Sequence, residues 1–390
     1  MRQRDILVVG GGIAGLTLAR GLVEGGHRVT LVERAPAWAP LGAGITLAGN
    51  AMAVLDRLGL GDGVREAGRR IPGGAVLDDA GRPLMETRLD DAGDAPALSD
   101  LWALHRADLH EVLATGATGA ELRLGTTVEA LSDDDDEVRA RLSDGTERAF
   151  DLVVGADGIR SQVRALALGD EAPELRYAGY TCWRVVAPNR VGLDASYEMW
   201  GCGARVGLVP LRDDRVYSFL VQNAPRGEQD PEGQDPVENL RRRFAGFGGP
   251  AGALLASLAG DAVVMRHDIE ELSRPAWGRG RVLLVGDAAH AMTPNLGQGA
   301  AQGVEDALAL CLALQRSDDD REVARAYQAT RADRAAAIQK TSRRIGAVGQ
   351  WSSPFACALR NALLRAIPSR STVKNLERTI APGMLLAAEA

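Results

Sequence analysis

The chain has 390 residues, of which 46% are hydrophobic, and it carries a formal net charge of -7 with a pI near 5.4. This length allows two or three compact units with sizeable cores. The 45 basic residues are scattered among 52 acidic ones, which argues against a nucleic-acid partner. No apolar stretch reaches the roughly 18 to 20 residues that cross a bilayer, and the amino terminus lacks the pattern of a signal peptide. We therefore expect a compact cytoplasmic protein.

The first motif is a glycine-rich turn between an apolar strand at residues 5–9 and an apolar helix at residues 16–23. Gly10 permits the tight turn, Gly12 lets a pyrophosphate approach the backbone, and Gly15 allows the helix to pack on the strand. The helix amino terminus offers free N–H groups to phosphates. A glycine-rich turn without a ligand is disfavoured, because the strand, the helix and a following acid all fall into place.

A second strand is expected at residues 28–33. It ends in Glu33, where nucleotide-binding units place an acid for the ribose hydroxyls. Further along, a loop at residues 44–47 leads into an amphipathic helix at residues 50–60. Residues 104–113 are expected to form another helix, with Arg106 at its beginning.

Residues 126–131, 138–142 and 147–150 alternate in polarity, which predicts a small antiparallel meander with a hairpin turn at Asp144-Gly145. The acidic run at residues 133–136 falls between two of these strands. Adjacent exposed acids repel one another, so a solvated turn is favoured over a metal site. No metal site is predicted elsewhere, because the His, Cys and Asp residues show no ligand spacing.

An apolar strand from residue 151 ends in Asp157-Gly158 and opens another helix. Ser161 could cap that helix. Arg164 could either reach phosphates or tie loops together, and the residues alone leave both roles open.

The most informative stretch is residues 286–303, which follow an apolar strand at residues 281–285 and precede a helix at residues 304–312. The stretch brings Asp287 and a glycine-rich segment to the point where the carboxyl end of a strand meets a helix amino terminus. Ligands of open α/β sheets bind at such points. It therefore predicts contact with a phosphate-bearing cofactor near its reactive end.

The predicted fold class is α/β, with a Rossmann-like cofactor domain, a mostly antiparallel β-sheet substrate domain and a helical C-terminal tail. The cofactor domain comprises residues 1–73, 101–179 and 273–320, the substrate domain residues 74–100 and 180–272, and the tail residues 321–390. Strands of the substrate domain are expected at residues 182–186, 196–200, 204–210 and 216–221. Their sheet would form a roof over the cofactor.

The four cysteines, Cys182, Cys202, Cys311 and Cys357, lie far apart and form neither a C-x-x-C pair nor a metal-ligand cluster. We expect them to be buried small hydrophobic residues in a reducing compartment. A flavin disulfide reductase needs a closely spaced redox pair, so this class is excluded.

Three separated motifs together resemble those of the single-component FAD-dependent aromatic hydroxylases, or group A flavoprotein monooxygenases. They are the turn at residues 10–15, the Asp157-Gly158 motif with Ser161 and Arg164, and the Gly286-Asp287 motif with Pro294 and Gly297-Gln298-Gly299. Weaker similarity covers nearly the whole chain. Within the family, the chain is most similar to small urate, salicylate and hydroxybenzoate hydroxylases and to related carotenoid epoxidases.

The resemblance implies a bound FAD. The implied cofactor-binding residues are Gly10, Gly12, Ala14 and Gly15 at the pyrophosphate, Glu33 at the ribose with Arg34 beside it, Arg106 at the phosphates or adjacent ribose, Val128 near the adenine, Asp157 and Gly158, Asp287 at the ribityl chain, and Pro294, Gly297, Gln298, Gly299, Ala300 and Ala301 in the motif at the flavin ring. A helix amino terminus there would stabilise negative charge on a reduced flavin. The chain lacks a second G-x-G-x-x-G unit, which fits transient binding of NADH or NADPH.

The implied activity is oxygen insertion into a small aromatic or heteroaromatic substrate. NADH or NADPH would reduce FAD, O₂ would form a flavin C4a-hydroperoxide, and its distal oxygen would move to an electron-rich carbon. An epoxidase, or an oxidase or reductase on the same scaffold, stays an alternative. A halogenase is disfavoured because the chain has no W-x-W-x-I-P segment, and a non-catalytic flavin-binding protein is less favoured. The protein could be a monomer or a homodimer.

Arg205 and Tyr217 lie on neighbouring predicted strands, at positions similar to the substrate-orienting pair of urate hydroxylases. Arg205 could hold an anionic substrate and Tyr217 could hydrogen-bond it over the flavin, or both could have purely structural roles. His290 could be a catalytic base, although support of its loop is the favoured role. The chain departs from its relatives at Arg184-Val185 and Gly49-Asn50, which leaves the identity of the substrate open.

Overall fold

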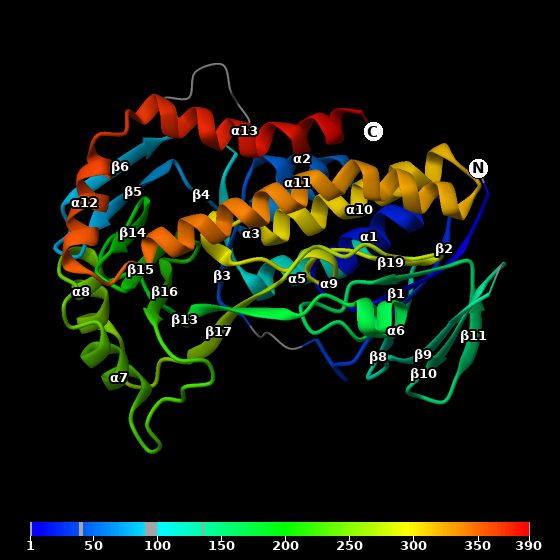
Figure 1. Cartoon of the computed structure of the whole chain (residues 1–390), viewed down its shortest axis with the longest axis horizontal. Coiled ribbons are helices and arrows are strands. Elements are labelled where there is room, and N and C mark those ends of the chain that lie inside the picture. The colour runs from blue at the N-terminus through cyan, green and yellow to red at the C-terminus, as the bar shows by residue number, and fades with distance from the viewer. Residues whose placement is uncertain (1, 39–41, 90–99, 135, 390) are drawn as a thin grey trace.

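The computed structural model describes residues 2–38, 42–89, 100–134 and 136–389. A mainly parallel sheet lies toward the end that carries the amino terminus, and a larger antiparallel sheet lies toward the opposite end (Figure 1). A long helix, α11 (Asp320–Gly349), runs across the molecule between these two ends. Both kinds of sheet and the helical C-terminal region that the sequence predicts are therefore present.

The six-stranded sheet has the order β18-β19-β12-β1-β2-β8, and all its pairings are parallel except that of β18 with β19. Its strands are β1 (Asp5–Val9), β2 (Arg28–Glu33), β8 (Glu121–Leu124), β12 (Leu152–Gly155), β18 (Gly278–Arg279) and β19 (Val282–Leu284). The central strands are continuous apolar runs because helices cover both faces of such sheets. The parallel strand predicted at residues 281–285 is thus confirmed.

Helices pack on this sheet and share one hydrophobic core with it. They are α1 (Ile13–Glu24), α5 (Arg106–Gly116), α6 (Gln162–Leu168), α9 (Asp287–His290) and α10 (Gly299–Arg316). The helix predicted at residues 104–113 starts later than expected, because Leu104 and His105 still pair in a strand. The helix predicted at residues 50–60 is present as α2 (Gly49–Arg57) and ends in a turn at Leu58–Gly59.

The predicted meander is present as β9 (Val128–Asp133), β10 (Val138–Leu142) and β11 (Glu147–Phe150). Gly145 in its hairpin turn has a φ of +83°, a conformation that favours glycine. Of the acidic run at residues 133–136, residue 135 lies outside the described residues. Asp133 accepts a hydrogen bond from the backbone N–H of Arg281, so this acid supports a neighbouring turn.

The seven-stranded sheet has the order β17-β13-β16-β15-β14-β5-β6 and is antiparallel except between β14 and β5. Its strands are β5 (Gly73–Asp78), β6 (Pro83–Arg88), β13 (Leu175–Pro188), β14 (Ser196–Trp200), β15 (Ala204–Leu211), β16 (Arg215–Asn223) and β17 (Val264–Leu272). One face packs on α7 (Pro236–Arg243) and α8 (Gly249–Ser257). The other face carries Tyr217 and a separate apolar cluster.

Smaller elements complete the chain. They are the three-stranded sheet of β3 (Gly44–Leu47), β7 (Trp102–His105) and β4 (Arg69–Arg70), the helices α2 (Gly49–Arg57), α3 (Gly61–Ala67), α12 (Pro354–Arg365) and α13 (Ser369–Ala388), and the 3-10 turns η1 (Gly169–Glu171) and η2 (Pro294–Leu296). The C-terminal helices close over the earlier ones, since α11 packs on α10 and α13 packs on α2.

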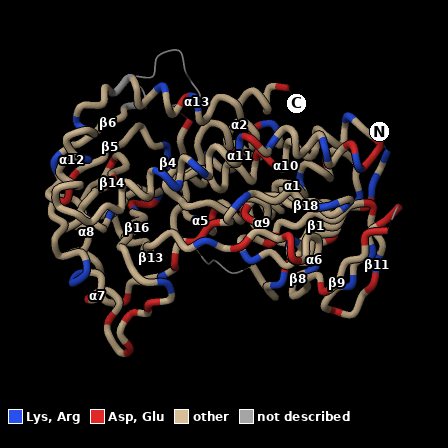
Figure 2. The backbone as a smooth tube through the Cα atoms, in the orientation of Figure 1, with Lys and Arg blue, Asp and Glu red and all other residues tan. Residues whose placement is uncertain are grey.

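Basic and acidic residues are interspersed along the chain rather than gathered in one basic surface (Figure 2). Within the described ranges, no helix combines the length and the apolar character that a membrane crossing requires.

Candidate functional site

The three predicted cofactor motifs meet at one edge of the six-stranded sheet. The glycine-rich turn follows β1, Asp157 follows β12 and Asp287 follows β19, and these strands are neighbours. A Cβ added to Gly10 would lie only 2.5 Å from the Ala156 carbonyl oxygen, so the first two motifs touch. The carboxyl ends of adjacent parallel strands share an edge, which brings together motifs that are far apart in sequence.

The glycines of the first turn serve different purposes. Gly10 has a φ of +109°, and a Cβ on Gly15 would lie 2.0 Å from the Gly10 carbonyl oxygen, so the fold itself requires both. Gly12 caps α1 and has no atom within 4 Å of an added Cβ. Ala14 packs against Gly286, where α1 contacts the loop that follows β19. Gly12 therefore leaves the open approach that a pyrophosphate needs.

Glu33 ends β2 and fixes the same turn. Its carboxylate accepts hydrogen bonds from the backbone N–H groups of Gly11 at 2.8 Å and Ala35 at 2.9 Å. Trp38 covers the turn, with ring atoms 2.6 Å from where a Gly11 Cβ would lie, and its ring centroid is 4.7 Å from that of His110. Sequence reasoning missed the two aromatic rings, because only folding brings them to the turn.

Asp157 organises the start of α6. Its carboxylate accepts hydrogen bonds from the backbone N–H groups of Gln162 at 2.7 Å and Val163 at 3.0 Å, and from the Ser161 hydroxyl. The Ser161 oxygen in turn accepts from the Arg164 N–H at 2.9 Å, which confirms the predicted helix cap.

The Arg164 guanidinium ties two of the three motifs together. It donates to the Ala288 carbonyl at 2.9 Å and to the Ile159 carbonyl at 2.7 Å, and the side chain is buried. Of the two roles left open by the sequence, the structure shows the one in which Arg164 joins loops.

The second glycine-rich segment forms a turn and a helix start. Gly297 is left-handed with a φ of +63°, and α10 begins at Gly299. The first helical N–H groups have no partner in a preceding turn, whereas the Gln302 N–H already donates to the Gln298 carbonyl at 2.9 Å. No atom lies within 4 Å of a Cβ added to Gly299. The start of α10 therefore combines free N–H groups with open space beside them. Both are needed to bind the electron-rich edge of a ring.

Asp287 and Arg106 lie close to each other at the cofactor edge. Asp287 is exposed, yet desolvation by the surrounding protein raises the pKa of its carboxyl, and His290 and Arg106 oppose this rise. Across the part of the chain that the structure describes, no side chain accepts a hydrogen bond from the exposed Arg106 guanidinium. Both groups are therefore available to a polar ligand.

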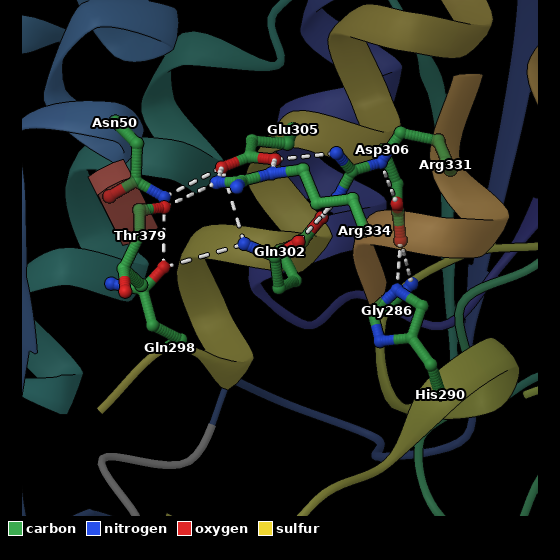
Figure 3. Close-up of polar contacts among 10 residues, drawn as sticks. All are labelled: Asn50, Gly286, His290, Gln298, Gln302, Glu305, Asp306, Arg331, Arg334 and Thr379. Atoms are coloured by element: carbon green, nitrogen blue, oxygen red, sulfur yellow. Dashed lines mark hydrogen bonds and ion pairs between the residues drawn. The ribbon is translucent and has the colours of Figure 1, made fainter. Parts of the chain in front are cut away.

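A buried network of polar residues connects the start of α10 to the neighbouring helices (Figure 3). Asp306 accepts hydrogen bonds from the Gly286 N–H at 2.8 Å and from Arg331 Nε at 2.7 Å. Glu305 pairs with Arg331 and with Arg334, and accepts from Asn50. Desolvation alone would raise the pKa of both acids, but the paired cations hold both below their ordinary values. The charges are therefore retained despite full burial.

The network also reaches the predicted flavin-ring segment. Asn50 Nδ2 donates to Gln298 Oε1 at 2.9 Å, and Gln298 is the residue that precedes α10. Arg334 also donates to the Thr379 carbonyl in α13 at 3.0 Å. Sequence reasoning missed this network because its members come from α2, α9, α10, α11 and α13.

His290 belongs to the same network. Its ring is fully buried, and its Nε2 pairs with Asp306. This position supports the loop, which was the favoured role, and it gives the ring no exposed surface for a substrate.

The sheet face that carries Tyr217 also carries other polar groups. The Arg184 guanidinium interacts electrostatically with the Tyr217 hydroxyl and lies 3.5 Å from His267 Nδ1. Burial raises the pKa of Tyr217 to about 12, so the hydroxyl is protonated at neutral pH. Burial, with Arg184 and Arg106 nearby, lowers the pKa of His267. The Tyr217 ring packs on Gly44, and the carbonyl of the neighbouring Ala43 accepts a hydrogen bond from the Arg106 N–H at 2.9 Å, so this face approaches the cofactor edge.

Arg205 lies on the same face as Tyr217, and their strands are neighbours as predicted. Arg205 pairs across the ladder with Val221, four positions along β16 from Tyr217, a separation of about 13 Å. The Arg205 side chain is almost fully buried. Its nitrogens donate to Gln350 at 2.9 Å, Glu198 at 3.0 Å and Asn295 at 2.8 Å. These partners occupy the side chain, and substrate binding by Arg205 stays a prediction.

The remaining predicted residues differ in accessibility. Arg34, Pro294 and Gly297 are exposed, Ala300 is partly buried, and Val128, Gln298 and Ala301 are buried. Val128 and Ala301 have no exposed surface in either side chain or backbone, so their contact with a cofactor stays a prediction. Gly158 has a φ of +80°, which suits a tight loop after β12.

This edge fits FAD. The open approach at Gly12, the free N–H groups at the start of α10, and the unpaired Arg106 guanidinium beside Asp287 match a ligand with phosphates, hydroxyls and an electron-accepting ring. Among the residues that the structure describes, none places an atom within 4 Å of a Cβ added to Gly12 or Gly299.

Comparison with known proteins gives the same cofactor. The family described as "FAD binding domain" matches residues 3–342. The chain is 40% identical over 383 residues to the aurachin C monooxygenase/isomerase of Stigmatella aurantiaca, covering 96% of this chain and 98% of that protein. It is 40% identical over 373 residues to the 2-heptyl-3-hydroxy-4(1H)-quinolone synthase of Pseudomonas aeruginosa, covering 94% and 95%. It is 30% identical to the 6-hydroxynicotinate 3-monooxygenase of Bordetella bronchiseptica, covering 86% and 90%.

Among solved structures, HpxO of Klebsiella pneumoniae complexed with FAD and uric acid superposes with a TM-score of 0.89 and 27% sequence identity, covering 98% of this chain and 97% of HpxO. The match of the FAD-binding family over most of the chain, and the full-length similarity to monooxygenases, agree with the geometry of the site. The chain therefore belongs to the FAD-binding-domain family of flavin-dependent aromatic monooxygenases.

Proposed function

We propose that this chain hydroxylates carbon 3 of a 4(1H)-quinolone that carries an apolar substituent at position 2, with O₂ and NADH or NADPH as co-substrates. The observation that carries this proposal is the 40% identity, over nearly the full length of each protein, to two relatives, one named aurachin C monooxygenase/isomerase and the other 2-heptyl-3-hydroxy-4(1H)-quinolone synthase. The relative named for an acid of the pyridine series is more distant, at 30% identity.

The sheet face above the cofactor edge supports this substrate class. Its apolar members Val209, Leu211 and Phe219 form one cluster around Tyr217. The ring of Phe219 lies directly on Gly207, where an added Cβ would be 1.9 Å from a ring atom. An apolar frame with few polar groups is the usual lining of a site for a largely apolar ring.

The polar donors in this frame suit a carbonyl oxygen. Tyr217 is protonated at neutral pH, and Arg184 is a permanent donor beside it. Together they would hold the 4-oxygen of a quinolone and so orient its electron-rich carbon 3 toward the transferred oxygen. The Tyr217 ring can lie where it does because residue 44 is a glycine. A Cβ on Gly44 would lie 2.4 Å from the Tyr217 ring.

FAD, when bound, supplies the activated oxygen after its reduction by NADH or NADPH. The residues of this chain bind and orient it. Gly12 and the start of α1 would take the pyrophosphate, Glu33 the adenosine ribose, and Asp287 the ribityl chain. The start of α10 would stabilise the negative charge of the reduced ring.

A second candidate is hydroxylation of an aromatic acid, such as a hydroxybenzoate or hydroxynicotinate. One observation favours it: within the described part of the chain, the Arg184 guanidinium has no carboxylate partner and could bind an anionic substrate. Epoxidation of a related substrate uses the same geometry and stays a further alternative.

We also propose that the protein works in the cytoplasm, where NADH and NADPH are available, as a monomer or homodimer. The division into cofactor, substrate and C-terminal regions that the sequence predicts is part of the same proposal, with the two sheets as the centres of the first two regions.

The test compares substrates on the FAD-loaded protein. We expect 2-heptyl-4(1H)-quinolone to stimulate NADH or NADPH oxidation and to gain one oxygen at carbon 3 by mass spectrometry and NMR, and 3-hydroxybenzoate and 6-hydroxynicotinate to be poor substrates. Efficient turnover of an acid with no quinolone turnover would overturn the proposal in favour of the second candidate.

A variant tests the assigned donor. Tyr217→Phe removes one hydrogen bond to the substrate and should lower kcat/KM by roughly threefold to tenfold. Tyr197→Phe is the matched control, since Tyr197 packs on the opposite face of the sheet. Equal kinetics for the two variants would remove Tyr217 from the site.

A further inference from the structure

Two cysteines that lie far apart in sequence meet at the junction between the seven-stranded sheet and α12. Cys202 is exposed in the turn between β14 and β15, and Cys357 is buried in the first turn of α12. Their thiols are close neighbours, because Cys357 Sγ and the N–H of Gly203, the residue after Cys202, donate to the same Trp351 carbonyl, and the two sulfurs interact electrostatically. The expectation that all four cysteines are buried is therefore wrong for Cys202, whereas Cys357 is buried as expected. The sequence did not reveal their proximity, because the turn and the helix are adjacent only in the folded chain.

The backbone around the two thiols is held in place. The Trp351 carbonyl accepts hydrogen bonds from the Gly203 N–H at 2.7 Å and from Cys357 Sγ at 3.2 Å. The buried Arg360 guanidinium donates to the Gly201 carbonyl at 3.0 Å and to the Gly349 carbonyl at 3.1 Å. The residues on both sides of Cys202 are thus bonded to the segment around Cys357.

The electrostatic surroundings give the two thiols different roles. Arg360 interacts electrostatically with both sulfurs, and a neighbouring guanidinium favours a thiolate. Burial and the contact with Cys202 nevertheless raise the pKa of Cys357 to about 11, so Cys357 is protonated at neutral pH. Cys202 is exposed, so it is the thiol that a dissolved oxidant reaches first.

We propose that Cys202 and Cys357 form a peroxide-responsive pair that closes reversibly to a disulfide, a site that is independent of the proposed substrate. Hydrogen peroxide would oxidise the Cys202 sulfur to a sulfenic acid and release water. Cys357 sulfur would then attack the Cys202 sulfur, and the sulfenic hydroxyl would leave as a second water. Two thiols and one peroxide give one disulfide and two waters, and a reducing dithiol restores both thiols.

The closed pair would fix the segment that holds Arg205. Gln350, next to Trp351, accepts a hydrogen bond from Arg205 at 2.9 Å and donates to Asn223 at 2.8 Å. Arg205 in turn donates to Asn295, in the η2 turn before the flavin-ring segment. Oxidation at the junction is therefore expected to change KM for the substrate more than the affinity for FAD.

The experiment treats the FAD-loaded protein with hydrogen peroxide, blocks remaining thiols by alkylation, and maps the peptides by mass spectrometry. Wild type should fall from four free thiols to two, with the loss of two hydrogen atoms in intact mass and a peptide that joins Cys202 to Cys357. Dithiothreitol should restore four thiols. The Cys311→Ser control, which removes a thiol buried in the cofactor-side core, should form the same disulfide and fall from three free thiols to one.

The two serine variants separate the steps. Cys357→Ser should stop at a sulfenic acid on Cys202 that a dimedone probe traps, and Cys202→Ser should keep its remaining thiols. The proposal is overturned if wild type keeps four thiols, if Cys202 is overoxidised without joining Cys357, or if another pair is cross-linked. Because the readout is thiol chemistry, failure of the quinolone assay leaves it unaffected.

Discussion

At the scale of single residues, the first turn shows that glycine can be required for different reasons at neighbouring positions. A side chain at Gly15 would collide with the Gly10 carbonyl oxygen at 2.0 Å, whereas a side chain at Gly12 would meet nothing within 4 Å. The requirement for glycine at Gly15 is therefore internal to the protein. At Gly12 no described residue would collide with a methyl group, so we predict that this glycine is required by a ligand.

This contrast gives a paired prediction. Gly12→Ala should leave the melting temperature of the FAD-free protein nearly unchanged and weaken FAD binding by about tenfold or more, because a methyl group would displace the pyrophosphate from the backbone. Gly15→Ala should lower the melting temperature of the FAD-free protein itself. Thermal unfolding and FAD titration of both variants provide the check, and unchanged FAD affinity in Gly12→Ala would place the pyrophosphate elsewhere.

At the scale of elements, α10 links the cofactor edge to the buried network. Its first turn faces the predicted flavin ring. Further along the helix, Glu305 pairs with Arg331, and Asp306 pairs with both Arg331 and His290. A buried carboxylate bound on several sides is costly to break, because each partner is left with an uncompensated charge or donor. We infer that the network sets the position of the Gly286 turn relative to α10.

Asp306→Asn tests this role. The change should lower the free energy of unfolding by about 3 to 5 kcal/mol, since Arg331 and His290 lose their shared anion in a buried site. Denaturant unfolding of the FAD-free protein gives the measurement. Asp134→Asn, which alters a surface pair with Arg139, is the control and should have little effect. Equal losses in both variants would mean that the buried network contributes no more than a surface pair.

At the scale of the whole molecule, tyrosine ionisation connects burial to alkaline stability. The protein has five tyrosines, and burial raises the pKa of each of them, to about 12 for Tyr177 and Tyr217. A group with a raised pKa binds its proton more tightly in the folded state. Its contribution to stability is therefore complete below the ordinary pKa of 10 and is lost as pH rises toward 12.

We expect the free energy of unfolding to fall between about pH 10 and pH 12, together with a late rise of tyrosinate absorbance. Tyr217→Phe should make this fall shallower, because one of the shifted groups is absent. Tyrosines that titrate near pH 10 while the protein is still folded would contradict the assignment.

Predictions from sequence succeeded where the signal is local. Residues 5–15 give a strand, a turn and a helix whose spacing is set by backbone geometry alone, and Ser161 caps α6 because a cap needs only its neighbours. Boundaries were less well determined, as at α5, where pairing of His105 with Gly44 in β3 delays the helix. Competition between strand pairing and helix formation depends on a partner that local periodicity does not contain.

The sequence by itself thus determined the α/β class and the FAD-binding edge, since three strand-and-loop motifs each carry their geometry within a few residues. Only the tertiary structure decided that Arg205 is bound by Glu198, Asn295 and Gln350, that Arg184 meets Tyr217, and that Cys202 meets Cys357. These contacts join segments that are distant in the chain. Their partners are chosen by the packing of sheets and helices, which no local pattern specifies.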